Sequence, residues 1–320
     1  MAQDTAGQAE RAEEPEPIRA VPLRRPGRWI AAVVVVVLVA LFVYGAATNE
    51  AFAWDVYGQY LFDARITEGA LRTIELTVLA MVIAVVLGVV LAVMRLSPNP
   101  VLRSAAWVYL WIFRGTPVYV QLVFWGLLPS IYKTLDVGVP FGPQFAHINL
   151  QDLQAAFLFA VIGLGLNEAA YMAEIVRAGV GSVGEGQLEA STALGMSWAQ
   201  TMRRTVLPQA MRVIIPPTGN ELISMLKTTS LVLAVPYTGE LWGRARDISG
   251  ANFQLIPLLL VAATWYLAIT SVLMIGQFYI ERHYSKGLSR VLTARQLQAL
   301  ADAQHKPVPP VAAPDAGGPL

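Results

Sequence analysis

GQLEASTALGMSWAQTMRRTVLPQA, the stretch from Gly186 to Ala210, lies between strongly apolar segments of the chain. Its first part, Gln187 to Leu194, is made mostly of residues with high helix propensity. Gly195 follows, and glycine commonly adopts the left-handed conformation that ends a helix. The stretch therefore predicts a short helix that stops at Gly195.

A second helical run is predicted directly after this stop. Ser197 and Gln200 have the spacing of a capping box, in which side chains satisfy free backbone amides at a helix start. The run over 198–206 is expected to end at Pro208, because proline lacks the amide proton that continues a helix. A first arm of about 12 Å is too short to be stable alone. We therefore interpret the corner as a loop that fits a groove on another protein.

The composition indicates an integral membrane protein. Of 320 residues, 55% are hydrophobic and 14% are charged, and the mean hydropathy is +0.52. Such a chain is too apolar for an ordinary soluble domain. A net charge of +1 gives no case for nucleic-acid binding. The sequence has no cysteine and its three histidines are far apart, so disulfides, a cysteine nucleophile and a metal site are not expected.

Six membrane-spanning helices are predicted, because apolar segments of roughly 20 residues can cross a bilayer. These segments lie at 30–47, 74–94, 102–128, 154–176, 211–235 and 256–280. A secretory signal is the alternative for the first segment, but the long charged lead and the lack of a convincing cleavage site disfavour it. Arg114 and Pro117 predict a bend in the third helix, and Pro216 and Pro217 a kink in the fifth.

The segments between the spans define the organisation of the chain. The predicted regions are a disordered tail at 1–28, an extra first helix with an outer linker at 29–70, a five-helix core at 71–284 with its inner loop at 178–210, and a tail at 285–320. Residues 130–151 are expected to form an outer loop. Residues 288–304 are expected to form a short surface helix, followed by disorder.

The distribution of basic residues predicts the orientation. With both termini in the cytoplasm, 16 of the 23 Lys and Arg residues lie on the inner side of the membrane and five on the outer side. Positive charges accumulate on the cytoplasmic side of membrane proteins. The corner at Gly195 is therefore expected to face the cytoplasm.

Several short sequence motifs resemble those of a known family. Glu189, Ala190, Ser191, Gly195, Leu207 and Pro208 have the spacing of the EAA loop in permeases of ATP-binding-cassette (ABC) importers. Further words look like the polar amino acid branch, of the histidine, glutamine, glutamate and arginine type: RGTP at Arg114–Pro117, YMAEIVR at Tyr171–Arg177, GQ at Gly186–Gln187, LPQA at Leu207–Ala210 and KTTSL at Lys227–Leu231. The resemblance covers residues 60–284. Ser191 stands where the pattern usually has alanine, and Thr205 where it usually has isoleucine.

This resemblance implies an all-α polytopic helical bundle of the type I importer permease kind. Its implied function is that of the transmembrane subunit of an ATP-driven importer for a polar amino acid in the cytoplasmic membrane. The loop residues that would couple it to the ATPase are Gly186, Gln187, Glu189, Ala190, Ser191, Gly195, Leu207 and Pro208. Implied partners are two ATPase subunits that bind ATP and magnesium, a second permease subunit and an extracytoplasmic amino-acid-binding protein.

The chain itself has no phosphate-binding G-x-x-x-x-G-K-[ST] motif, so it is not expected to hydrolyse ATP or to be an enzyme alone. Two other functions stay open. A gradient-driven secondary transporter would use an intramembrane carboxylate such as Glu168 and would not need the corner. A non-transporting assembly or sensor subunit would keep the docking loop. The amino acid carried, the choice between homodimer and heterodimer, and the subunit that holds the substrate pocket are likewise open.

Polar side chains within the predicted spans are candidates for a substrate path, because charges inside a membrane are costly and usually functional. Asn167, Tyr171 and Glu174 recur on one helix face, with Glu168 beside them. The candidate path consists of Gln121, Asn167, Glu168, Tyr171, Asn220, Glu221 and Lys227. A polar contact between neighbouring helices is an equal alternative for Asn167 and Glu168.

A zwitterionic substrate needs hydrogen-bond acceptors and donors together, which Glu168 and Lys227 would supply as a pair. The alternative is that Lys227 balances the charge of Glu221. Four further residues are interpreted as structural or gating groups: Arg114, Pro117, Glu174 and Arg177.

Overall fold

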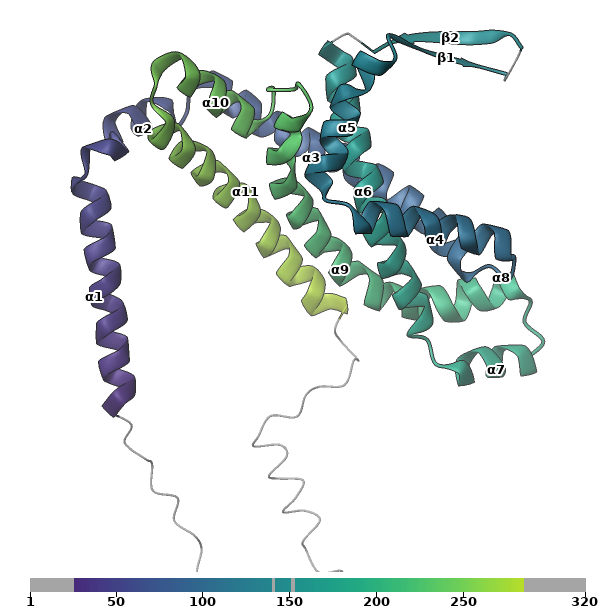
Figure 1. Ribbon diagram of the computed structural model, residues 1–320. Helices are drawn as coiled ribbons and strands as arrows, with labels where there is room; N and C mark the ends of the chain where they lie inside the picture. Colours follow the sequence, from purple (N-terminus) through teal and green to yellow (C-terminus); the bar gives the residue numbers. More distant parts are fainter. Residues whose placement is uncertain (1–25, 140–141, 151–152, 285–320) are drawn as a thin grey trace, which may run out of the picture. The chain divides into compact units, whose positions relative to one another are not determined.

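The computed structural model describes residues 26–139, 142–150 and 153–284 (Figure 1). Within these ranges the chain is helical apart from one two-stranded hairpin. It divides into two compact units, Met1–Ala53 and Trp54–Leu320. The predicted tails at 1–28 and 285–320, with the surface helix at 288–304, lie almost entirely outside the described residues.

The first unit contains helix α1 (Pro26–Thr48) and the short 3₁₀ helix η1 (Glu50–Phe52). The most apolar window of α1 has a mean hydropathy of 2.9, and none of it is buried. A helix of this length and composition suffices to cross a bilayer. The structure thus has a helix where an extra first span is predicted, at 30–47.

Four described helices are long and apolar enough to span a membrane. Besides α1, they are α3 (Ala64–Leu96), α6 (Leu153–Gly181), whose span starts at Ala156, and α11 (Leu255–Tyr284). These helices contain the predicted spans at 74–94, 154–176 and 256–280. Of the two remaining predicted spans, the third is divided between two shorter helices. The fifth lies on a helix of 22 residues that carries several polar and charged side chains, so its composition rather than its length excludes it.

The predicted third span is two helices rather than one bent helix. Helix α4 (Pro100–Gly115) ends before Thr116, and α5 (Val118–Ile131) begins after Pro117. Proline disfavours helical geometry in the residue before it, and Thr116 has the extended torsions φ −115° and ψ 143°. The RGTP motif at Arg114–Pro117 therefore forms a break between two helices.

The predicted fifth span is also composite. Helix α9 (Leu207–Thr228) remains helical through Pro216 and Pro217, and the 3₁₀ helix η3 (Thr229–Ala234) continues it. The side-chain amide of Gln277 on α11 donates a hydrogen bond of 2.7 Å to the carbonyl of Pro216. This contact attaches α11 to the proline-containing part of α9.

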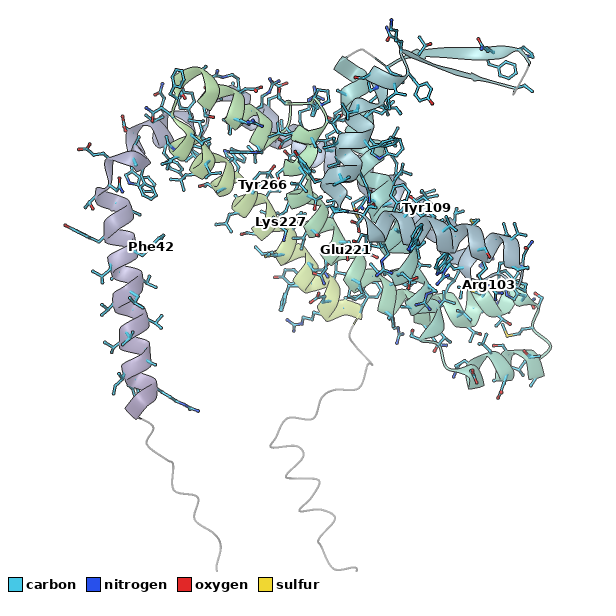
Figure 2. All side chains as sticks on the ribbon, viewed as in Figure 1. Phe42, Arg103, Tyr109, Glu221, Lys227 and Tyr266 are labelled. Atoms are coloured by element: carbon cyan, nitrogen blue, oxygen red, sulfur yellow. The ribbon has the colours of Figure 1, made fainter. Side chains whose placement is uncertain are left out.

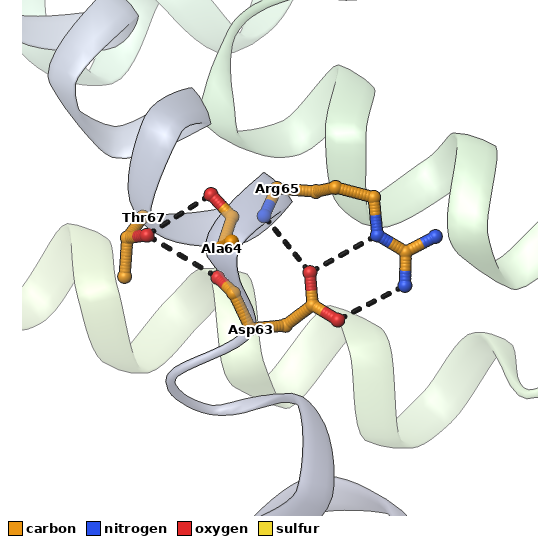
Figure 3. Close-up of polar contacts among 4 residues, drawn as sticks. All are labelled: Asp63, Ala64, Arg65 and Thr67. Atoms are coloured by element: carbon orange, nitrogen blue, oxygen red, sulfur yellow. Dashed lines mark hydrogen bonds and ion pairs between the residues drawn. The ribbon is translucent and has the colours of Figure 1, made fainter.

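Helix α3 begins at Ala64 rather than at residue 74, and Asp63 explains the earlier start. The Asp63 carboxylate accepts hydrogen bonds from the backbone amide of Arg65 at 2.9 Å and from the Arg65 guanidinium at 3.0 Å (Figure 3). Aspartate is a preferred residue at a helix N-cap because its side chain satisfies these free amides. The short helix α2 (Trp54–Tyr60) precedes this cap.

A β-hairpin lies within the predicted outer loop at 130–151. Strands β1 (Thr134–Gly138) and β2 (Gln144–Asn149) pair antiparallel, with an irregularity after Val137. The hairpin is the one departure from all-α structure in the described part of the chain.

Helix α6 lies at the centre of the second unit, where it packs against α3, α4, α5 and α9. Its contact with α3 depends on glycine, because a Cβ added at Gly88 would lie 2.5 Å from the Cβ of Met172. A Cβ at Gly165 would similarly lie 2.9 Å from the Cβ of Ile83. Small residues let helix backbones approach closely in membranes. Helix α10 (Leu241–Asn252) packs against α3 and α11.

Candidate coupling corner and substrate cavity

The predicted corner consists of α7 (Glu185–Ala193), a turn through Gly195, and α8 (Trp198–Thr201). Gly195 has φ +69°, in the left-handed region. Its amide donates to the Thr192 carbonyl at 2.9 Å, and the Met196 amide donates to the Ser191 carbonyl at 3.1 Å. These bonds satisfy carbonyls at the end of α7. The predicted helix stop at Gly195 is confirmed.

The second arm differs from the prediction at its far end. Both hydrogen bonds of the capping box between Ser197 and Gln200 are present. Pro208, however, does not end the helical run. The chain continues from α8 through the π-helix η2 (Met202–Val206) into α9. Pro208 lies in the first turn of α9, where a missing amide proton is tolerated.

The corner presents apolar side chains to solvent. Leu194 and Trp198 are 79% and 75% exposed, and Glu189 is exposed on the same short helix pair. Large apolar side chains exposed together indicate a binding surface. A buried cluster fastens the corner to the start of α9, and its members are Val183, Val206, Ala210 and Ile214. Of the eight predicted coupling residues, Ser191 alone is buried.

A cavity of about 550 Å³ lies between α6, α9 and the break that separates α4 from α5. Six predicted residues line it, namely Arg114, Pro117, Asn167, Glu168, Tyr171 and Glu221. The hydroxyl residues Thr116, Ser224 and Thr228 also line the cavity, and sequence reasoning did not single them out as path residues. Thr116 and Thr228 belong to the family motifs RGTP and KTTSL, and this membership is the sequence feature that could have indicated them.

Two carboxyl groups line this cavity from different helices. Glu168 on α6 is 7% exposed, and its carboxyl group interacts with that of Glu221 on α9. Its Oε1 atom is buried without a hydrogen-bond partner among the described residues. An unpaired buried polar group is costly. Glu168 Oε1 is thus a buried acceptor without a partner in the described part of the chain, in a residue that lines the cavity together with a second carboxyl group.

Asn167 and Gln121 form a polar contact between helices. The Asn167 amide donates hydrogen bonds of 3.1 Å to Gln121 Oε1 and to the Phe113 carbonyl. Gln121 donates in turn to the Thr116 hydroxyl at 2.7 Å. These bonds satisfy backbone and side-chain groups around the break between α4 and α5. Gln121 thus supports the cavity wall, and Asn167 both supports and lines it.

The four predicted structural or gating residues lie in two places. The Arg114 guanidinium lies 5.5 Å from the centroid of the Tyr171 ring, within the range of a cation–π interaction. Pro117 belongs to the break between α4 and α5 and lines the same cavity. The Arg177 guanidinium forms an ion pair of 2.7 Å with Glu174, one turn earlier on α6. This ion pair agrees with the structural interpretation of Glu174 and Arg177.

Lys227 and Asn220 do not share the cavity of Glu168. Both line a second cavity of about 330 Å³ between α9 and α11, together with Gln277 and Glu281. Glu221 and Lys227 both lie on α9 (Figure 2). Positions six residues apart on a helix point in directions about 120° apart. The predicted pairing of Glu168 with Lys227 is therefore not made within this chain.

The membrane-spanning helices, the corner around Gly195 and the internal polar cavity together define the class of protein. Over residues 84–286 the chain matches the family described as "binding-protein-dependent transport system inner membrane component". This match spans more than half of the chain, and the chain belongs to that family.

Individual relatives narrow the class. The chain is 62% identical over 292 residues to the arginine transport system permease protein ArgU of Corynebacterium glutamicum, covering 91% of this chain and 90% of that protein. It is 36% identical over 208 residues to the histidine/lysine/arginine/ornithine transport system permease protein HisM of Escherichia coli K12. This match covers 64% of this chain and 83% of that protein. A crystal structure of an amino acid ABC transporter with histidines has a TM-score of 0.59 and 31% identity, covering 72% of this chain and 98% of that one.

The chain is therefore the membrane-spanning subunit of an amino acid ABC importer. This assignment favours ATP-driven transport over the gradient-driven carrier that the sequence alone left open.

Proposed function

We propose that this subunit carries a cationic amino acid of the arginine type, and that the corner at Gly195 couples transport to a separate ATPase. The observation that carries the substrate class is the pair of carboxyl groups in one cavity, Glu168 and Glu221. A substrate cation in this cavity would pair with these two carboxyl groups.

The chemistry of a guanidinium fits this cavity. Its planar array of N–H donors pairs well with carboxylate oxygens, and such charge-assisted hydrogen bonds are among the strongest in proteins. The Tyr171 ring lines the same cavity, and the Arg114 guanidinium, 5.5 Å from its centroid, shows that the ring can hold a guanidinium by a cation–π contact. The relative from C. glutamicum, whose name gives arginine as the substrate, supports the same class.

The coupling function rests on the exposed surface of the corner. Leu194, Trp198 and Glu189 lie there in a geometry fixed by the Gly195 turn. We infer that the importer has two ATPase subunits, which would bind ATP and magnesium, and that one of them contacts this surface from the cytoplasm. A second permease subunit would complete the pathway, and an extracytoplasmic binding protein would deliver the amino acid. Both termini would lie in the cytoplasm.

The substrate proposal is tested by uptake of labelled L-arginine into proteoliposomes that contain the whole importer with its binding protein. Glu168→Gln and Glu221→Gln should each reduce uptake about ten-fold, the effect of losing roughly 1.5 kcal/mol from a charge-assisted hydrogen bond. Unlabelled lysine or ornithine should compete, whereas glutamate should not.

The matched control is Glu75→Gln, which removes an exposed carboxylate that is paired with Arg72 on α3. Uptake should be unchanged in this variant. Full arginine uptake by Glu168→Gln, or an equal loss in Glu75→Gln, would rule out the proposed site.

A further inference from the structure

Ser191 and Thr205, the two positions that depart from the family pattern, contact one another. Their hydroxyl oxygens are 3.1 Å apart, although the residues are 14 positions apart in the chain. Ser191 is 4% exposed, on a short helix whose other coupling residues face solvent. The contact joins α7 to the π-helix η2.

The hydroxyl protons can be assigned from the neighbouring bonds. The Ser191 hydroxyl donates to the Gln187 carbonyl at 2.8 Å. A hydroxyl group has one proton, so the Thr205 hydroxyl must donate to Ser191. Each hydroxyl then has a definite role, and removal of either one removes the hydrogen bond between Ser191 and Thr205.

A second polar contact runs parallel to the first. The side-chain amide of Gln209 on α9 donates to the Thr205 carbonyl at 3.0 Å and to the Gln187 side-chain oxygen at 3.5 Å. Helix α7 is thus tied both to η2 and to the first turn of α9. The π-helix itself is a rare element that occurs mostly as single turns at functional sites.

We propose that the Ser191–Thr205 hydroxyl pair is a clamp that positions α7 against the start of α9. When the ATPase moves α7, the clamp makes α9 follow, instead of letting the Gly195 turn absorb the movement. Helix α9 also carries Glu221, so the same rigid element reaches the substrate cavity. Ser191 and Thr205 are positioning residues, and this inference rests on the proposed coupling function of the corner.

The test measures ATP hydrolysed per molecule of L-arginine imported by the complete importer in proteoliposomes. Ser191→Ala and Thr205→Val should each raise this ratio about five-fold, as expected when one neutral hydrogen bond is lost. The double variant Ser191→Ala/Thr205→Ile replaces the polar contact by an apolar one. It should return the ratio to within about two-fold of the wild type, because an isoleucine side chain is large enough to pack on the alanine methyl group.

The matched control is Thr192→Ala. The Thr192 hydroxyl donates only to the Leu188 carbonyl of its own helix, at 2.9 Å, and is exposed. Its removal should leave the ratio unchanged. Co-purification of the ATPase with each variant reports assembly, and a single variant that fails to assemble while the double variant assembles and couples also supports the clamp.

Three results would overturn the clamp. The first is a double variant that raises the ratio of ATP hydrolysed to arginine imported about 25-fold, which is the product of two independent losses. The others are a double variant that does not assemble with the ATPase, and a Thr192→Ala variant that raises the ratio as much as Ser191→Ala does. Glu189→Arg separates this failure from failure of the coupling function. If Glu189→Arg leaves the ratio unchanged, the proposed coupling itself is wrong. If Glu189→Arg raises the ratio while the pair behaves independently, the clamp alone is wrong.

Discussion

Gly195 is the residue on which the geometry of the corner depends. Its φ of +69° is strained for any residue with a side chain, whereas a Cβ there would meet no atom within 4 Å. Packing therefore imposes no constraint at this position, and backbone conformation imposes a strong one. The effect of a substitution should appear in coupling rather than in the stability of the helical core.

Gly195→Val is expected to uncouple the importer. A left-handed conformation costs a residue with a side chain about 1–2 kcal/mol, and a β-branched residue is disfavoured further, so the turn should rearrange. ATP hydrolysis should persist while arginine uptake falls, as measured on the reconstituted importer. Gly250→Ala on α10 is the control, because a Cβ at Gly250 would meet no atom within 4 Å, its φ is not positive, and it lies outside the coupling corner. Normal uptake by Gly195→Val at normal membrane levels would contradict this role.

Asp63 makes the start of α3 sensitive to acid. The hydrogen bond from the Arg65 side chain lowers the pKa of Asp63, so the folded state favours the carboxylate. Stability from this group is therefore fully present above the ordinary aspartate pKa of about 4, and it is lost as the pH falls through the lowered pKa of the folded state.

Asp63→Asn should lower the melting temperature of the detergent-solubilised protein at pH 7, and this difference from wild type should shrink as the pH falls below about 4. Asp55→Asn, at an exposed position in the first turn of α2, is the control and should show a smaller effect. A difference between wild type and Asp63→Asn that is the same at every pH would show that the charge of Asp63 is not the cause.

At the scale of elements, the close approach of α3 and α6 should be the most sensitive helix contact. Gly88→Val should destabilise the bundle by about 1–3 kcal/mol, because its side chain would overlap Met172 and the backbone at Ala173. Thermal unfolding in detergent measures this loss. Gly276→Val, on α11 where a Cβ would meet nothing within 4 Å, is the matched control. Equal melting temperatures for the two variants would contradict the packing argument.

Elements defined by local sequence were predictable, and elements defined by tertiary contacts were not. Apolar runs identify the cores of α1, α3, α6 and α11, and the Ser197 capping box identifies the start of α8. The π-helix at Met202–Val206 has no such signal. It coincides with the burial of Val206 and the contact of Thr205 with Ser191, which depend on how distant segments pack.

The same distinction applies to the candidate site. Helix periodicity, which is local information, predicted that Asn167, Glu168, Tyr171 and Glu174 share a region of α6. Asn167, Glu168 and Tyr171 line one cavity, and Glu174 does not line it. The position of Lys227 could not be predicted from its charge. It depends on the packing of α9 against both α6 and α11. Residues of α9 therefore line two cavities, and Lys227 lines a different cavity from the one that Glu168 lines.

At the scale of the whole molecule, the corner and the substrate cavity are connected by one helix. Helix α9 begins at the corner, where Val206 and Ala210 are buried, and carries Glu221 to the cavity. A movement imposed on the corner therefore reaches the cavity without passing through a flexible segment in this part of the chain. This connection is the physical basis of the proposed coupling between ATP hydrolysis and amino acid transport.

The most direct test of this account is ATP hydrolysis by the reconstituted importer with its binding protein, with and without L-arginine. The wild type should show arginine-stimulated hydrolysis together with arginine uptake. Glu189→Arg, which reverses an exposed charge on the corner, should abolish both the stimulation and the uptake while the subunits still assemble. Arginine uptake that persists without the ATPase, or stimulation that is unchanged in Glu189→Arg, would contradict the account.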